Sequence, residues 1–559
     1  MPVERPGTGD DMRRSGWGIT SFLLLVAASA WAAQATSFEQ VISRINQRET
    51  QFTRKMHTYS PMVETYIQDM RPDPELGEVP ASDTYFLGRL DMSRGVVTTA
   101  SFVHDHNSWL HRHVGSLTEM KYNPAGFAVV SPDATQLDAA HYEFTFVRRE
   151  FLGDVRCLVF DVVPKKNTGQ GRFLGRIWVE DQDYNIVRFN GTFAPRPRFG
   201  YYFHFDSWRL NMGPNLWLPA YTYSEEMNMK YSVPHNNLSF KAQTRFWAYN
   251  VHSRGRQDEL TEVLVEQAPS VKDQSDNTQD LSPVQSKRMW ARESEDNVLD
   301  KLERSGLLAH EGEVDKVLDT VVNNLAISNK IDLQPEIHCR VLLTAPLESF
   351  SIGHTIVMSR GLLDVLPDES TLAAVLAHEM AHIMLAHGEN PMYGFNDKML
   401  FSEQQTFTKL RLGRAPEQEQ AADAKALDML NNSPYKDQFA NAGLFLRALQ
   451  QRAPVLPNLI RAHLGNGLTQ GNRTRMSELV ASAPALEMNK LDQIAALPMG
   501  ARIKVDPWSD RAEMSKAKPV ALLSAREKMF FEVTPVYPHM TRVSDKRATE
   551  EVAATSAAE

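Results

Sequence analysis

The hydrophobic pattern of this chain changes from strand-like to mostly helical after about residue 250, and this change restricts the folds that it can adopt. Between about residues 84 and 250, short β-type runs follow one another, with turn residues such as Asn190-Gly191 between some of them. Strands spaced this evenly, without helical patterns between them, indicate an antiparallel sheet. Beyond residue 290 the apolar residues recur mostly at helical spacing. The sequence therefore predicts an α+β protein, with an antiparallel β-domain of curved sheet followed by a mostly helical domain with a small sheet.

The length of the chain and one polar stretch predict that it consists of more than one domain. At roughly 150 residues per domain, 559 residues are too many for one core. The polar stretch 267–290 is nearly free of large apolar residues, which is typical of a linker between two separate cores. The expected boundaries are signal peptide 1–35, N-terminal helix plus β-domain 36–266, linker 267–290, second domain 291–455, C-terminal helical and strand extension 456–543, and disordered tail 544–559.

The first 35 residues predict export. Arg13-Arg14 precede a mostly apolar stretch, Ile19–Ala33, and the pairs Ala30-x-Ala32 and Ala33-x-Ala35 offer signal-peptidase sites. An uncleaved N-terminal anchor is the alternative, although the apolar stretch is short for a membrane span. We expect a periplasmic or secreted protein after cleavage of the signal peptide.

Composition excludes several partners. Lysine and arginine total 60 and aspartate and glutamate 69, so the formal net charge is −9. Without a positive excess the chain lacks the field that holds nucleic acid. No run of 18 apolar residues follows the N-terminal segment, so no polytopic membrane segment is expected. The two cysteines, Cys157 and Cys339, lie in separate strand-like runs. We expect buried free thiols there, with a disulfide as the alternative.

A metal-binding motif lies on a helix expected from about Asp368 to His387. It consists of His378, Glu379 and His382, in the order His-Glu-x-x-His. Two histidines four residues apart lie on one helical face, so both imidazoles can reach one zinc ion. Glu379 can then act as general base toward water at the metal. The surrounding residues are apolar nearly all round the helix, which predicts burial, and a metal removes the cost of burying these polar groups.

A catalytic zinc site needs a third protein ligand. Glu419 is the best candidate, because it lies on a second helix that starts near Pro416; Glu417, on another face, is the alternative. Asp423 lies one turn beyond Glu419, where it can accept the free ring N–H of a ligating histidine. His387 fits a histidine favoured by the helix C-terminal dipole better than a ligand. The expected cofactor is one Zn2+ per chain.

These motifs together resemble a known family. Leu372-Ala-Ala-Val-Leu-Ala-His378-Glu-Met-Ala-His382, followed by Glu419-x-x-Ala-Asp423, resembles the gluzincin zinc metallopeptidases. That family includes HtpX, the periplasmic BepA-type proteases and the type I CAAX prenyl protease. The resemblance covers roughly residues 311–450 and implies a zincin-type peptidase fold for the second domain. It also implies zinc ligation by His378, His382 and Glu419, catalysis by Glu379 and support of the site by Asp423.

The resemblance extends to substrate binding, with two departures. The strand Thr355, Ile356, Val357, Met358 looks like the edge strand that binds extended substrate in this family. The usual Asn-Ala-Phe before that strand reads Glu348-Ser349-Phe350 here. The downstream His-Pro followed by an arginine is not evident, and Arg473 and Arg475 are the nearest substitutes.

The β-domain has a resemblance of its own. The run from Gly175 to Arg188 resembles the lipoprotein-carrier fold of the LolA and RseB type, in which a curved sheet holds acyl chains. This resemblance implies contact with lipid or lipoproteins through the β-domain. The aromatic residues of these strands fit either an ordinary core or an apolar groove.

The sequence as a whole predicts an exported zinc-dependent endopeptidase that uses metal-activated water. Its expected substrates are polypeptides, in particular unfolded or misassembled envelope proteins. One alternative is a chaperone or lipoprotein-binding quality-control protein in which binding by the β-domain is primary. The other is a pseudo-enzyme with structural zinc, against which the intact Glu379 argues, because a purely structural site needs no base.

Overall fold

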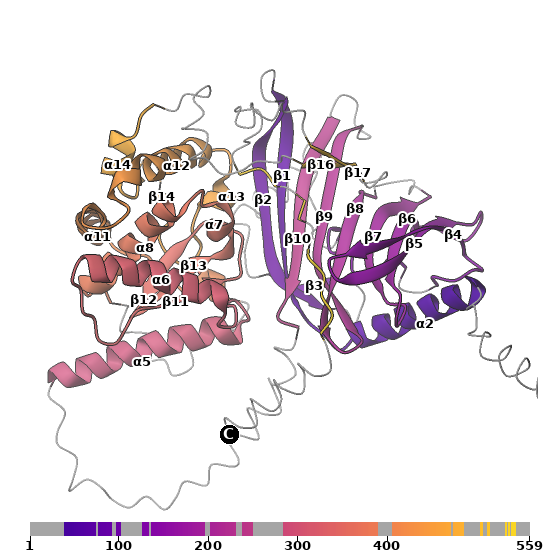
Figure 1. The fold of residues 1–559 in the computed structure, drawn as a ribbon, viewed down its shortest axis with the longest axis horizontal. Coiled ribbons are helices and arrows are strands. Elements are labelled where there is room, and N and C mark those ends of the chain that lie inside the picture. The colour runs from indigo at the N-terminus through magenta and orange to yellow at the C-terminus, as the bar shows by residue number, and fades with distance from the viewer. Residues whose placement is uncertain are drawn as a thin grey trace, which may run out of the picture.

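The computed structural model confirms an α+β protein with a sheet and a helical part side by side (Figure 1). The described residues are 38–73, 77–91, 97–101, 126–133, 136–195, 202–230, 237–249, 283–388, 405–470, 473–485, 503–506, 511–514, 531–533, 535–536 and 538–543. The predicted signal peptide, most of the predicted linker and the predicted tail lie outside these ranges.

A ten-stranded antiparallel sheet forms the N-terminal part. Its order is β3-β2-β1-β10-β9-β8-β7-β6-β5-β4, so β4 to β10 form a meander and β10 returns to pair with β1. The strands are β1 (Met62–Asp73), β2 (Gly77–Asp91), β3 (Val97–Ser101), β4 (Tyr142–Leu152), β5 (Val155–Pro164), β6 (Arg172–Glu180), β7 (Ile186–Ala194), β8 (Phe205–Gly213), β9 (Leu216–Lys230) and β10 (Asn237–Trp247).

Strand β1 precedes the strand pattern predicted from the sequence. Its two faces are both covered: Val63 and Ile67 join clusters on one face, whereas Met62 and Tyr66 join the cluster on the other. Because neither face meets water, the strand lacks the apolar and polar alternation that identifies a half-buried strand.

Helix α2 (Phe38–Met56) covers one face of the sheet. Its Ile42 and Ile45 pack into a cluster with strand side chains such as Phe173 and Phe189. A buried ion pair joins the helix to β8, since Glu49 Oε1 accepts a hydrogen bond from Arg209 Nη2 at 2.7 Å. The helix is therefore part of the β-domain core.

The helical part contains a small mixed sheet and the helices around it. The sheet has the order β11-β13-β12, with β11 parallel and β12 antiparallel to the central β13. Helix α8 packs against α11, α12 and α6. The elements are α5 (Pro283–Arg304), α6 (Glu313–Ser328), β11 (His338–Leu342), β12 (Ser349–Ile352), β13 (Thr355–Ser359), α7 (Arg360–Val365), α8 (Glu369–Met384), α10 (Thr406–Lys409), α11 (Pro416–Asn431), η3 (Lys436–Gln438), α12 (Phe439–Arg452), α13 (Pro457–Ile460), β14 (Thr469–Gln470), β15 (Arg473–Thr474) and α14 (Ser477–Ser482).

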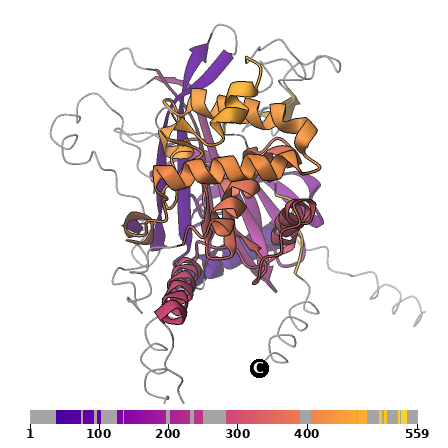
Figure 2. The same ribbon diagram turned by 90° about the vertical axis from the view of Figure 1, so that its left-hand side faces the viewer.

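The polar linker had suggested two fully separate cores, but the two parts share one apolar cluster. One apolar cluster contains Tyr85 and Trp217 of the sheet, Leu347 and Phe445 of the helical part, and Phe531 near the C-terminus. The helical part lies against the sheet at its β2 and β1 end, which Figure 2 shows from the helical side. A linker can join parts that pack tightly, because its composition reports only its own lack of a core.

The described residues of the C-terminal segment 531–543 lie across the same face of the sheet. Gln68 of β1 donates to Phe531 O at 2.6 Å and accepts from Val533 N at 2.8 Å. Farther along, Asp154 N donates to Met540 O at 2.8 Å in the turn between β4 and β5. This segment shares the cluster that buries Trp178, Trp208 and Trp217. Two further strands of the C-terminal extension, β16 (Ile503–Asp506) and β17 (Arg511–Met514), pair with each other.

Both cysteines are buried and free, so the disulfide alternative is not what the structure has. Within the described ranges, every helix is too short or too polar to cross a bilayer.

Candidate metal centre

Helix α8 brings the two histidines of the motif to one place. Its N-cap Asp368 accepts a hydrogen bond from Thr371 N at 2.8 Å, as an N-terminal cap does. Nearly every side chain from residue 370 to 382 is buried, in agreement with the apolar pattern. The helix ends at Met384, three residues before the predicted end, and Ala386 adopts a left-handed conformation with φ 53°. The C-cap of the helix is Leu385.

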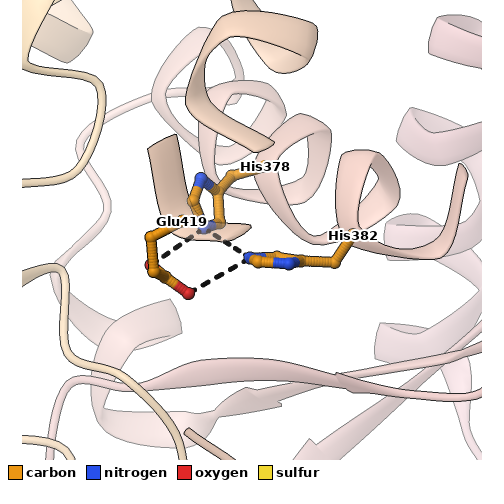
Figure 3. A group of neighbouring side chains, drawn as sticks. All are labelled: His378, His382 and Glu419. Carbon is orange, nitrogen blue, oxygen red and sulfur yellow. Dashed lines mark hydrogen bonds and ion pairs between the residues drawn. The ribbon is translucent and has the colours of Figure 1, made fainter. Parts of the chain in front are cut away.

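His378, His382 and Glu419 converge with their ligand atoms toward one point (Figure 3). His378 Nε2 lies 3.1 Å from His382 Nε2 and 3.4 Å from Glu419 Oε2, and His382 Nε2 lies 3.2 Å from Glu419 Oε1. Ligands about 2.0–2.1 Å from a tetrahedral zinc ion stand about 3.3 Å apart. The three distances between these ligand atoms therefore match a zinc site with three protein ligands. Two imidazoles and one carboxylate are also a ligand set that zinc accepts.

Helix α11 supplies the carboxylate of the converging group, and this carboxylate belongs to Glu419 and not to Glu417. Pro416 occupies the first turn of this helix, as the sequence predicted. Glu419 is buried against α8, whereas Glu417 points to solvent. One turn farther on, Asp423 Oδ1 lies 2.9 Å from His378 Nδ1. Asp423 therefore fixes the ring of His378 with Nε2 directed at the other two groups.

The carboxylate of Glu379 lies beside this group and is held from two sides. Ser349 of β12 donates its hydroxyl to Glu379 Oε1 at 2.7 Å. Arg475, which follows β15, places Nη1 2.7 Å from the same oxygen and Nε 3.5 Å from Glu419 Oε2. Both partners are themselves buried, so the position of Glu379 is tightly fixed.

Arg475 and Ser349 were not assigned to the site from sequence. Arg475 appeared only as a substitute for an absent motif, and Ser349 only as a departure from Asn-Ala-Phe. The signal that could have found the arginine is charge: a buried site with three carboxylates, Glu379, Glu419 and Asp423, requires a compensating cation.

The charges of the site keep Glu379 and Glu419 ionised. Burial raises the pKa of Glu379, but the charges of Arg475 and the two histidines outweigh burial and hold that pKa below its ordinary value. The pKa of Glu419 falls well below its usual range, because Arg475 and the histidines again outweigh burial. For His378, burial and Arg475 lower the pKa, but Asp423 and Glu419 raise it more, and the net shift is upward. The pKa of His382 is lowered, chiefly by burial.

His387 contacts the site from outside. Its Nδ1 lies 2.9 Å from Nδ1 of His382, on the side of that ring away from the converging nitrogens. It is therefore not among the three groups that converge, and it lies beyond the end of α8.

The strand expected to bind substrate is not an edge strand. Residues Thr355–Met358 belong to β13, whose main chain pairs with β11 on one side and β12 on the other. Strand order depends on pairing between distant residues, which the local sequence does not encode. The edge strand beside the site is β12, and Ser349, which contacts Glu379, is its first residue.

No curated protein matches the chain. Among solved structures that match is a crystal structure described as that of an outer membrane lipoprotein-sorting protein domain from Vibrio parahaemolyticus, with 8% identity, a TM-score of 0.19, and coverage of 39% of this chain and 97% of that one. A TM-score this low carries no argument, so lipid contact by the β-domain stays a prediction.

The helical part gives a family match that includes every residue of the converging group. The model of Peptidase family M48 matches residues 313–487, which span α6, the small sheet, α8, α11 and Arg475. Members of that family are zinc metalloproteases. Residues 313–487 of this chain are a domain of peptidase family M48.

Proposed function

We propose that this chain is an exported zinc-dependent endopeptidase that hydrolyses peptide bonds of unfolded or misassembled envelope proteins. The observation that carries the proposal is the convergence of His378, His382 and Glu419 at tetrahedral spacing beside the fixed carboxylate of Glu379. A purely structural zinc site would not need an ionised carboxylate next to its ligands. The proposed location is the periplasm or the exterior of the cell, and it rests on the predicted signal peptide.

The metal would be held by Nε2 of both histidines and by the carboxylate of Glu419, one ion per chain. When bound, zinc supplies a Lewis acid that polarises a carbonyl and lowers the pKa of water. Asp423 keeps Nδ1 of His378 paired, so that Nε2 is free to act as a ligand.

Glu379 is the proposed general base and then general acid. Its lowered pKa keeps it ionised at neutral pH, so it can accept a proton from the attacking water. As the water oxygen bonds to the carbonyl carbon and the C–N bond breaks, the same proton passes to the leaving nitrogen. Ser349 and Arg475 hold the carboxylate in place for both transfers.

The proposed substrate path is the outer edge of β12 in place of β13. The carbonyl oxygens of Ser349 and Ser351 face away from β13 and accept hydrogen bonds from Arg475 and Arg414, respectively. An extended substrate could add to this edge as a further strand if it displaces Arg414 from the carbonyl oxygen of Ser351. Recognition through main chain favours segments that are unfolded, because a folded substrate has no free strand to offer.

The test is hydrolysis of casein by purified protein, measured with and without a chelator and after addition of zinc. We expect zinc-dependent cleavage by the wild type. Glu379→Gln should retain zinc and a native melting temperature but lose activity by several orders of magnitude, because the water loses its proton acceptor. Near-normal turnover by Glu379→Gln, or cleavage that survives removal of the metal, would rule the mechanism out.

A further inference from the structure

Arg475 belongs to the segment 457–475, of which the structure describes residues 457–470 and 473–475. The segment begins with α13, passes over residues 461–468 and the hairpin of β14 and β15, and ends at Arg475. Arg475 is anchored to the segment itself, since its N donates to Leu468 O at 2.8 Å and its Nη2 to Asn466 O at 2.7 Å. The position of the guanidinium therefore depends on what fixes this segment.

The start of the segment is fixed by the β-domain. Asp83 of β2 is buried and accepts hydrogen bonds from Asn458 N at 3.1 Å and from Leu459 N at 2.8 Å. The side chain of Asn458 donates to Asp83 Oδ1 at 3.0 Å and to Asp83 O at 2.9 Å. Figure 1 shows α13 next to β2, at the boundary between the two parts.

A second carboxylate fixes the middle of the segment. Glu348, directly before β12, is fully buried and accepts from His463 N at 3.0 Å and Leu464 N at 2.9 Å. The ring of His463 also packs against Tyr85 of β2, with centroids 5.4 Å apart. The β-domain thus touches the segment at two places before it reaches the site.

We propose that Asp83 and Glu348 are positioning residues for Arg475, so that the β-domain is required for the catalytic step itself. The proposal rests on the peptidase function proposed above. Its chain of contacts is short: Asp83 holds the first turn of α13, Glu348 holds residues 463–464, and the segment then presents Arg475 to Glu379. Without these carboxylates the backbone N–H groups at both places lose their buried acceptors, and the segment can shift.

This role differs measurably from substrate recruitment. If the β-domain only captures substrate, a change in its contacts to the peptidase domain should alter KM. A β-domain that positions Arg475 affects kcat, because the perturbed group acts on the base after the substrate is bound.

The test is Asp83→Asn in the full-length chain. Asparagine has the same shape as aspartate, but an NH2 group replaces one of the two carboxylate oxygens. That NH2 group then faces N–H donors of Asn458 or Leu459 in place of an acceptor. We expect kcat to fall about 10- to 100-fold, with KM within about twofold and zinc content unchanged, as is usual when a group that orients an active-site residue is altered. Amide hydrogen exchange of residues 458–475 should become faster in the same variant, whether or not the protein has activity.

Arg475→Gln provides the coupling measurement. In that background Asp83→Asn should lower kcat by less than about threefold, because residues that act through one group are not additive. The matched control is Glu180→Gln, a buried carboxylate of the β-domain that accepts hydrogen bonds from backbone N–H groups of Gln182, Asp183 and Asn185 and forms an ion pair with Arg542 of the C-terminal segment. It should lower the melting temperature and leave kcat unchanged.

Several results would overturn the proposal. An Asp83→Asn variant with wild-type kcat and wild-type amide exchange at 458–475 would do so, as would an Asp83→Asn variant in which only KM changes. Full additivity of the kcat losses of Asp83→Asn and Arg475→Gln would also contradict it. So would a loss of kcat in Glu180→Gln equal to that in Asp83→Asn. If Asp83→Asn does not fold, Asn458→Ala removes the side-chain half of the contact and gives the same readouts. A wild type without any peptidase activity would refute the proposed function, and the exchange measurement would still decide the positioning role.

Discussion

Glu348→Gln should remove a component of stability that depends on pH. Burial raises the pKa of Glu348 to about 7, against an ordinary value of 4.5, although backbone N–H groups and Arg475 act in the opposite direction. Because the folded state holds the proton more tightly, this contribution is present at low pH and is lost as pH rises through about 7. At 1.36 kcal/mol per pKa unit, the whole shift corresponds to about 3.4 kcal/mol, of which about 2.5 kcal/mol falls between pH 5 and pH 8.

Glutamine imitates the protonated acid and does not titrate. Relative to the wild type, Glu348→Gln should therefore gain about 2–3 kcal/mol of unfolding free energy between pH 5 and pH 8. Urea unfolding of both proteins at the two pH values measures this difference. Glu313→Gln, at a site exposed to solvent on α6, is the control and should show no such change. An identical pH dependence of the wild type and Glu348→Gln would refute the assignment of a raised pKa to this buried carboxyl.

Three further changes test the site and the packing. Asp423→Asn should lower zinc affinity or activity about 10–100-fold, measured by metal competition and casein hydrolysis, because His378 loses its charged partner; an unchanged affinity and activity would contradict that role. Ser349→Ala should keep zinc but lower kcat about tenfold, because Glu379 loses one of its two holding contacts; a change in KM alone would point to substrate binding instead. Residues 291–559 expressed alone should fail to fold by circular dichroism, because their core is shared with the sheet and Arg360 loses Glu64; a cooperative melt of this fragment would contradict the shared core.

The features that sequence predicted are those encoded locally. The histidine pair and Glu379 depend only on helical spacing, and α8 has the burial that its apolar surroundings indicated. Glu419 and Asp423 come from another helix, but their i, i+4 spacing after Pro416 is again local. The structure brings all five groups together.

The features that sequence missed depend on contacts between distant residues. Strand β12 is four residues long, too short for a periodic signal, and so the edge was assigned to β13. Arg475 reaches the site only through the path of residues 457–475, which Asp83 fixes from almost 400 residues away. The shared core could not be predicted either, because a polar linker says nothing about the packing of the parts that it joins.

The most direct test of this account is metal analysis of the wild type, Glu419→Gln and Glu417→Gln, purified under identical conditions. The three converging groups predict about one zinc per chain in the wild type. Glu417→Gln should keep that zinc, because its side chain is exposed, whereas Glu419→Gln should lose most of it while retaining its fold. Full zinc in Glu419→Gln, or loss of zinc in Glu417→Gln alone, would contradict the metal centre described here.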